Sequence, residues 1–247
     1  MQQLPLRVRP NEVVRFETFV PGPNREVLHL LSGGSAPSVL WLWGRSGTGK
    51  SHLLRAACAA ASDRGGVATY IDLQATTAPG LLDGCESLDL VALDGLDPVA
   101  GDAEWNAAIF RLHTLMQDGP GRLLISSTSP PAALRFTLAD LRSRLLAAPV
   151  LQLRELDEAG QIQALEARAA RRGLELSREA AAYLVHRLPR DMQSLCAVLD
   201  RLDEAALVAQ RRLTVPFLRE VLEAQVPDST RWPATPSGTP RFFGCTH

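Results

Sequence analysis

The sequence predicts an α/β protein in which helices flank a parallel sheet and a small all-helical domain follows. Three observations support this prediction. Strand-like apolar runs alternate with helix-like segments up to residue 155, a phosphate-binding motif joins one such run to the next helix, and only amphipathic helical patterns follow from residue 156. Alternation of this kind favours parallel strands, because each return to the start of the sheet needs a crossover connection.

The phosphate-binding motif occupies residues 44–51. It has the spacing of a glycine, four residues, then glycine, lysine and serine, and it follows the apolar run 39–43 and opens a helical pattern. Backbone N–H groups can curl closely around a phosphate where side chains do not intrude, and Gly44, Gly47 and Gly49 meet that need. A chance glycine-rich turn before a helix is the alternative interpretation.

Charged and polar side chains complete the motif. Lys50 can reach the outer phosphates of a nucleotide, and the Ser51 hydroxyl can hold Mg²⁺. Lys50 is the only lysine in the chain, which argues against a chance match. We therefore expect a nucleoside diphosphate or triphosphate as the ligand.

A second candidate for metal binding stands at the end of the buried strand expected over 88–94. A carboxylate at the carboxyl end of a strand beside a phosphate loop is where a Mg²⁺ ligand belongs, so Asp94 joins Ser51 as a candidate ligand; a simple turn aspartate is the alternative. Gly95 follows, although a hydrolysing enzyme of this type needs a carboxylate there or close by to orient water. Asp97 is a candidate substitute.

Periodicity and caps predict the other elements of the first domain. Asn24 is expected to cap a helix that ends near residue 31, and a helix over about 102–117 is expected to place Leu115 on its core-facing stripe. Further strands are expected at 67–71, 122–128 and 150–153, and further helices at about 50–63 and 138–145.

The predicted organisation has four parts. The N-terminal arm contains Gln3, Leu4 and Leu6, which suit a docking peptide as well as a frayed terminus, and composition leaves both open. Helices of the second domain are expected at about 157–171, 178–187, 191–208 and 215–224. The parts are an extended arm over 1–10, an α/β domain over 11–155, a helical domain over 156–226 and a disordered tail over 227–247.

Composition narrows the function classes. The formal net charge of −1 provides no electrostatic footprint for direct binding of DNA or of a membrane surface. The longest apolar runs fall short of a membrane span, and the first residues lack the order of a signal peptide, so the cytoplasm is the expected location. The four cysteines show no CxxC pair, so neither a zinc site nor a disulfide framework is expected.

A phosphate-loop sheet domain followed by a small helical lid is the plan of AAA+ proteins, and the motifs resemble the DnaA/Hda family. Residues 49–54 look like the phosphate loop of the initiator DnaA, and residues 16–24 resemble the segment that the family places against adenine. The resemblance covers about residues 2–225. It is closer still to the Hda proteins, DnaA-related regulators, in the order and spacing of residues 100–110, 122–131 and 213–217.

This resemblance implies an adenine nucleotide as the ligand, ADP or ATP with Mg²⁺, and ADP by preference. The arginine of a Ser-Arg pair after the fourth strand is an arginine finger in the family, which implies that role in trans for Arg144. Together with the motif, the resemblance assigns nucleotide binding to Phe19, Val20, Gly44, Ser46, Gly47, Thr48, Gly49, Lys50, Ser51, His52 and Gln193.

The implied partners are DnaA and the β sliding clamp of DNA polymerase III. Hda proteins begin with a glutamine-leucine peptide that docks on the clamp, and Gln3, Leu4 and Leu6 match it. The implied function is negative regulation of replication initiation, in which hydrolysis of DnaA-bound ATP is promoted by a regulator held on a DNA-loaded clamp. DNA would be contacted only through the clamp. The residues after the lid are too few and too polar for a DNA-binding domain like that of DnaA, so an initiator is not expected.

Three residues depart from the family pattern. Thr128 stands in place of an aspartate, Gln193 in place of a lid arginine, and Gly95 in place of a polar residue. Loss of the arginine removes a cationic contact to the phosphates. The alternative function is that of an AAA+ ATPase of the helicase-loader or transposition-helper type, which hydrolyses its own ATP and binds single-stranded DNA through a basic channel. A nucleotide-binding scaffold is a third interpretation. The sequence leaves open the bound nucleotide, any hydrolysis by the chain itself, and homo-oligomer formation.

Overall fold

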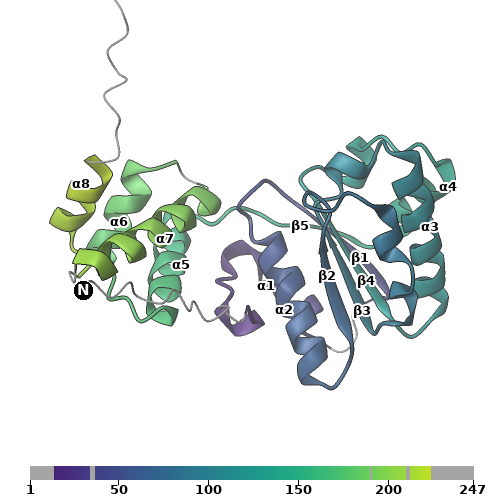
Figure 1. Ribbon diagram of the computed structural model, residues 1–247, viewed down its shortest axis with the longest axis horizontal. Helices are drawn as coiled ribbons and strands as arrows, with labels where there is room; N and C mark the ends of the chain where they lie inside the picture. The colour runs from purple at the N-terminus through teal and green to yellow at the C-terminus, as the bar shows by residue number, and fades with distance from the viewer. Residues whose placement is uncertain (1–13, 34–36, 190, 210–211, 224–247) are drawn as a thin grey trace, which may run out of the picture.

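The computed structural model describes residues 14–33, 37–189, 191–209 and 212–223. A five-stranded parallel sheet, in the order β2-β3-β4-β1-β5, continues from β5 into the helices α5 to α8, which lie together to one side (Figure 1). The parallel sheet predicted from the sequence is confirmed. The strands are β1 (Val39–Trp43), β2 (Ala68–Asp72), β3 (Leu90–Asp94), β4 (Arg122–Ser127) and β5 (Val150–Gln152).

Helices cover both faces of the sheet (Figure 1). In β1, Leu40 and Leu42 pack with α1 and α2, whereas Val39 and Trp41 pack with α3 and α4. Because both faces are covered, the central strands are continuous apolar runs and show no alternation of polar with apolar residues. These helices are α1 (Arg25–Ser32), α2 (Lys50–Asp63), α3 (Ala103–Asp118) and α4 (Ala139–Ala147).

The predicted core stripe of α3 is wrong at one position. Leu112 and Met116 are buried in the core, whereas Leu115 is 51% exposed. Residues 112 and 116 are four apart and share a helix face, whereas residue 115 lies about 100° from residue 116 and turns toward solvent. The sheet-facing stripe of α3 therefore excludes Leu115.

The role expected of Asn24 is also different. Its side chain makes no capping hydrogen bond to α1. The amide instead pairs with the backbone of Arg154: Nδ2 donates to the Arg154 oxygen at 2.9 Å, and Oδ1 accepts from the Arg154 nitrogen at 2.8 Å. The buried Asn24 side chain thus ties the N-terminal segment to the chain just after β5, where the helical lid begins.

The lid is all-helical, as the sequence predicts. Asp157 and Ser177 cap two of its helices, accepting from the backbone N–H groups of Gly160 and Ala180 respectively. Its helices enclose a separate apolar core that includes Leu165, and they are α5 (Glu158–Arg171), α6 (Arg178–Arg187), α7 (Met192–Ala209) and α8 (Val215–Glu223).

None of the helices in the described part of the chain combines the length and apolar character that a membrane span requires. The predicted arm over 1–10 and tail over 227–247 lie outside the described residues. Short 3₁₀ turns occur at Phe16–Thr18, Gly22–Asn24, Pro79–Leu82, Cys85–Ser87, Asp97–Val99 and Pro131–Ala133.

Candidate functional site

A cavity of about 630 Å³ lies where the phosphate loop, the N-terminal segment and the lid meet. Strand order explains its place, because β1, β4 and β3 are neighbours and their carboxyl ends share one edge of the sheet. The predicted residues that line this pocket are Phe19, Val20, Ser46, Gly47, Thr48, Gly49, Lys50, Ser51, His52, Asp94 and Gln193.

The glycines of the loop are required by close contacts as well as by backbone conformation. Gly49 has φ of +96°, and a Cβ there would lie 2.6 Å from the ring of Phe19. Gly47 has φ of +81°, and a Cβ there would lie 3.1 Å from the backbone nitrogen of Met192. Gly44 is not among the lining residues and lies at the base of the loop, where a Cβ would be 2.4 Å from a backbone oxygen of Leu153.

Lys50 is a buried cation at the first turn of α2. Its side chain is folded against the loop, and Nζ donates to the backbone oxygens of Gly44 at 2.6 Å and Arg45 at 2.9 Å. Burial lowers the pKa of Lys50, while the nearby carboxylates of Asp94 and Asp97 raise it. The phosphate loop therefore holds the Lys50 ammonium group against its own backbone carbonyl oxygens.

Asp94, at the end of β3, is 7% exposed and is oriented by two hydroxyl groups. Tyr70 Oη donates to Asp94 Oδ2 at 2.5 Å, and Ser126 Oγ donates to Oδ1. Burial, followed by the hydrogen bond to Asp94, raises the pKa of Tyr70 to about 12, so the phenol stays a neutral donor. Carboxylate and hydroxyl oxygens are the donors that Mg²⁺ prefers, so Asp94 and Ser51 fit this ion chemically.

Asp97 is committed to the turn after β4. Its carboxylate accepts from the backbone nitrogen of Thr128 at 2.8 Å, from Thr128 Oγ1 at 2.6 Å and from the backbone nitrogen of Ser129 at 3.3 Å. Asp97 does not line the pocket, whereas Thr128 does. These contacts leave Asp97 poorly suited to orient water at a nucleotide, although the sequence made it a candidate for the carboxylate that Gly95 lacks.

Gln74 lines the pocket beside Gly95, and sequence reasoning missed it. A Cβ at Gly95 would lie 3.1 Å from Gln74 Nε2, so the amide occupies the space next to the glycine. Nothing in the local sequence signals this contact, because Gln74 follows β2 while Gly95 follows β3.

The lid contacts the phosphate loop at the start of α7. Asp191 accepts from the backbone nitrogen of Ser194 at 2.7 Å, and hydrogen bonds from Ser194 lower the pKa of this carboxyl. Next to this cap, Gln193 Oε1 accepts from Ser46 Oγ at 2.7 Å. Gln193 is thus a neutral lid partner of the phosphate loop.

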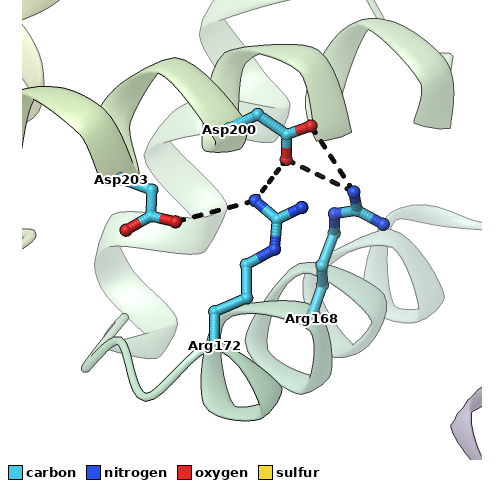
Figure 2. A network of polar contacts seen from close by, with 4 residues as sticks. All are labelled: Arg168, Arg172, Asp200 and Asp203. Carbon is cyan, nitrogen blue, oxygen red and sulfur yellow. Dashed lines mark hydrogen bonds and ion pairs between the residues drawn. The ribbon is translucent and has the colours of Figure 1, made fainter. Parts of the chain in front are cut away.

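Ion pairs join α7 to α5 and to the residue just after it in the lid, and sequence reasoning missed these too. Figure 2 shows Arg168 and Arg172 reaching across to Asp200, with Asp203 beside them. Arg168 Nη2 lies 3.3 Å and Arg172 Nη1 2.6 Å from Asp200 Oδ1, and Arg172 Nη1 lies 3.8 Å from Asp203 Oδ2. Arg168 and Asp200 also line the pocket, so the wall carries both signs of charge.

Arg144 lies elsewhere in the molecule. It is an exposed residue of α4, and its guanidinium carbon is 4.9 Å from the centroid of the Phe110 ring. Figure 1 shows α4 and the lid at opposite ends of the molecule, and Arg144 is not among the residues that line the pocket. Gln3, Leu4 and Leu6 lie outside the described residues.

A phosphate loop after β1, the strand order β2-β3-β4-β1-β5, a carboxylate ending β3 and a helical lid over the loop define an AAA+ fold. Domain III of the Thermotoga maritima initiator DnaA is similar, with a TM-score of 0.74, 17% identity and coverage of 89% of this chain and 98% of that one. AMPPCP-bound DnaA from Aquifex aeolicus has a TM-score of 0.64 at 22% identity, covering 80% and 66% of the two chains. The RuvB branch migration motor of Thermotoga maritima has a TM-score of 0.59 at 17% identity, covering 79% and 64%.

The lid narrows the class further. Residues 152–222 match the family model of the lid domain of Hda. The resemblance to Hda, a DnaA-related AAA+ protein, is therefore confirmed by a lid of the Hda type and a fold like that of DnaA domain III.

Proposed function

We propose that the pocket binds an adenine nucleotide between the phosphate loop and the lid. The loop would hold the phosphates through its backbone N–H groups and Lys50, with the positive end of α2 adding to the attraction. Phe19 and Val20, which line the same pocket, would contact the base. The similar DnaA from Aquifex aeolicus is bound to AMPPCP, an ATP analogue, which supports this ligand class.

Mg²⁺ would be held by Ser51 and Asp94 and would neutralise charge on the outer phosphates. We infer a preference for ADP, because Gln193 supplies a neutral amide where the family has an arginine. A neutral amide gains no attraction from the additional charge of the γ-phosphate, so this lid contact removes an advantage that ATP would have over ADP. Calorimetric titration with ADP and ATP, with and without Mg²⁺, tests both assignments.

We propose that the protein is a negative regulator of replication initiation that promotes hydrolysis of ATP bound to DnaA. The observation that carries this proposal is the position of Arg144, exposed on α4 and outside the chain's own pocket. An arginine in that position can be offered to a nucleotide on a neighbouring protein. There it would stabilise the charge that develops on the transferred phosphoryl group.

The decisive experiment compares hydrolysis of DnaA-bound ATP with wild-type protein and with Arg144→Ala, on DNA-loaded clamp. An arginine finger acts in the transition state, so its loss should reduce the rate of ATP hydrolysis on DnaA while nucleotide binding is kept. Arginine fingers contribute about 10³–10⁵-fold to such rates, which sets the largest loss to expect. Arg142→Ala is the matched control, because Arg142 is another exposed arginine of the same helix. Stimulation by Arg144→Ala equal to wild type would rule out Arg144 as an arginine finger acting in trans.

We further propose that Gln3, Leu4 and Leu6 dock on the β sliding clamp. A glutamine amide and two leucines form a compact peptide that can enter an apolar pocket. Leu4→Ala with Leu6→Ala should remove two buried contacts of about 1.5–3 kcal/mol each and abolish an interaction of this size. Co-elution of the double variant with the clamp, at an unchanged melting temperature, would place the docking peptide elsewhere.

A further inference from the structure

We propose that Gln74 orients the water that attacks the γ-phosphate of ATP in this chain's own pocket. The protein would then convert its bound ATP to ADP slowly, without a partner's arginine, and so reach the ADP state by itself. This inference rests on the nucleotide site described under the proposed function.

The first argument is the contact between Gln74 and Gly95. An ideal Cβ at Gly95 would lie 3.1 Å from Gln74 Nε2, 3.3 Å from Cγ and 3.6 Å from Cδ. The Gln74 amide therefore occupies the space into which a side chain at position 95 would project. Gly95 has φ of +77°, a conformation that side-chain-bearing residues rarely adopt, so the glycine and the glutamine form one arrangement. The turn after β2 thus places an amide where related hydrolases carry a polar side chain after β3.

The second argument is that the turn carrying Gln74 is fixed next to the end of β3. The backbone nitrogen of Leu73 donates to the backbone oxygen of Asp94 at 2.9 Å, and Leu73 is only 2% exposed. The backbone nitrogen of Gln74 donates to Asp72 Oδ1 at 3.0 Å. Gln74 itself is exposed and lines the pocket together with Asp94. Its backbone is therefore held in place while its amide faces the cavity.

The third argument is that the other polar groups nearby have different tasks. Both oxygens of Asp97 accept hydrogen bonds from the turn that carries Thr128. The two oxygens of Asp94 accept from hydroxyl groups, and this carboxylate is the candidate metal ligand. Asp72 also lines the pocket, but its Oδ1 accepts from the Gln74 backbone. The Gln74 side chain occupies the space of the side chain that Gly95 lacks.

The proposed step is hydrolysis of ATP. The water oxygen forms a bond to the γ-phosphorus, the bond from that phosphorus to the β,γ-bridging oxygen breaks, and its electron pair stays on the bridging oxygen of ADP. The water proton passes to a phosphate oxygen, and the products are ADP and inorganic phosphate. Gln74 gains and loses no proton, because its amide oxygen accepts a hydrogen bond from the water and only positions it, the role that a glutamine has in some GTPases.

The test measures hydrolysis of ATP by the full-length protein in single turnover, without DnaA or clamp, for wild type and Gln74→Ala. We expect the variant to be slower by at least about tenfold, since water positioning is lost, while its ADP affinity stays within about twofold of wild type. Gln163→Ala is the matched control, because Gln163 is an exposed glutamine of α5 outside the pocket. Asp72→Asn removes the charge of the neighbouring carboxylate, and comparison of its rate with that of Gln74→Ala shows which of the two side chains positions the water.

A second readout is independent of turnover. ADP with aluminium fluoride mimics the transferred phosphoryl group and its attacking water, so wild type should bind this mixture more tightly than ADP alone, and Gln74→Ala should lose that gain. No hydrolysis by wild type, or an unchanged rate and unchanged analogue affinity in Gln74→Ala, would overturn the inference. Loss of the rate in Asp72→Asn but not in Gln74→Ala would assign the role to Asp72 instead. Failure of wild type to bind ADP at all would refute the nucleotide site itself, a different result from any of these.

Discussion

On the sheet side of the pocket, Lys50 and Asp94 are 8% and 7% exposed, whereas on the lid side the side chains of Arg168 and Asp200 are 25% and 32% exposed. On the sheet side, Lys50 donates hydrogen bonds to backbone oxygens of the loop, and Asp94 accepts them from two hydroxyl groups next to the apolar core. The lid wall is held by ion pairs between two surface-lying helices, shown in Figure 2.

This difference has a physical consequence. Charges that are shielded from water interact strongly and are hardly screened by salt, whereas half-exposed pairs are weaker and are screened. The sheet wall should therefore fix the position of the phosphates, and the lid wall should adjust how tightly the pocket is covered. Removal of a group from the sheet wall should cost more nucleotide affinity than removal of one from the lid.

The largest effect is expected at Lys50. Lys50→Ala removes a charge-assisted contact to the phosphates and should weaken ADP and ATP binding at least tenfold, about 1.4 kcal/mol or more. Calorimetry measures both affinities. Arg45→Ala is the control, because Arg45 belongs to the same loop yet has a side chain that is 83% exposed. Unchanged affinity in Lys50→Ala would refute the assignment of the loop.

The next effect is expected at the lid. Asp200→Ala leaves the guanidinium groups of Arg168 and Arg172 without the carboxylate they share, and it should lower the free energy of unfolding by about 1 kcal/mol. Nucleotide affinity should fall less than in Lys50→Ala. Urea unfolding at low and high salt checks the cause, because the difference from wild type should shrink as salt rises. Asp203→Ala removes one contact of 3.8 Å and should have a smaller effect. Equal losses in both variants at every salt concentration would argue against the ionic explanation.

A smaller effect of opposite sign is expected at Tyr70. Tyr70→Phe frees Oδ2 of Asp94 from the phenol, which otherwise competes with a metal ion for that oxygen. The Mg²⁺ concentration needed for half-maximal ATP binding should fall by about threefold. In free energy this change is smaller than the contribution of one hydrogen bond to a charged group. A magnesium titration at fixed ATP measures this shift. A higher requirement for Mg²⁺ in the variant would mean that the phenol supports metal binding.

The smallest effect is expected where lid and loop touch. Gln193→Ala removes the hydrogen bond from Ser46, which lies at an exposed position, and should weaken nucleotide binding by about twofold. Calorimetry under the conditions used for Lys50→Ala gives the comparison. A loss as large as that of Lys50→Ala would mean that the lid residue binds the phosphates directly, and the distinction between the two walls would then fail.

The sequence by itself determined the parts of the molecule that depend on neighbours along the chain. The loop 44–51, the strand that ends on Asp94 and the lid helices with caps at Asp157 and Ser177 follow from spacing over a few residues. Such signals are readable because helix and strand periods and the needs of a phosphate are local. The same reasoning failed for Leu115, where the limit of the buried stripe depends on how α3 is rotated against the sheet.

The tertiary structure alone decided the contacts between residues far apart in sequence. The placement of Gln74 against Gly95, the hydroxyl of Tyr70 on Asp94 and the pairing of Arg168 with Asp200 join different strands or helices. In the sequence, each of these residues is typical of a surface position or a strand, and no local pattern indicates its partner. Strand order and helix packing bring these groups together, because burial of the apolar faces fixes which chain segments become neighbours.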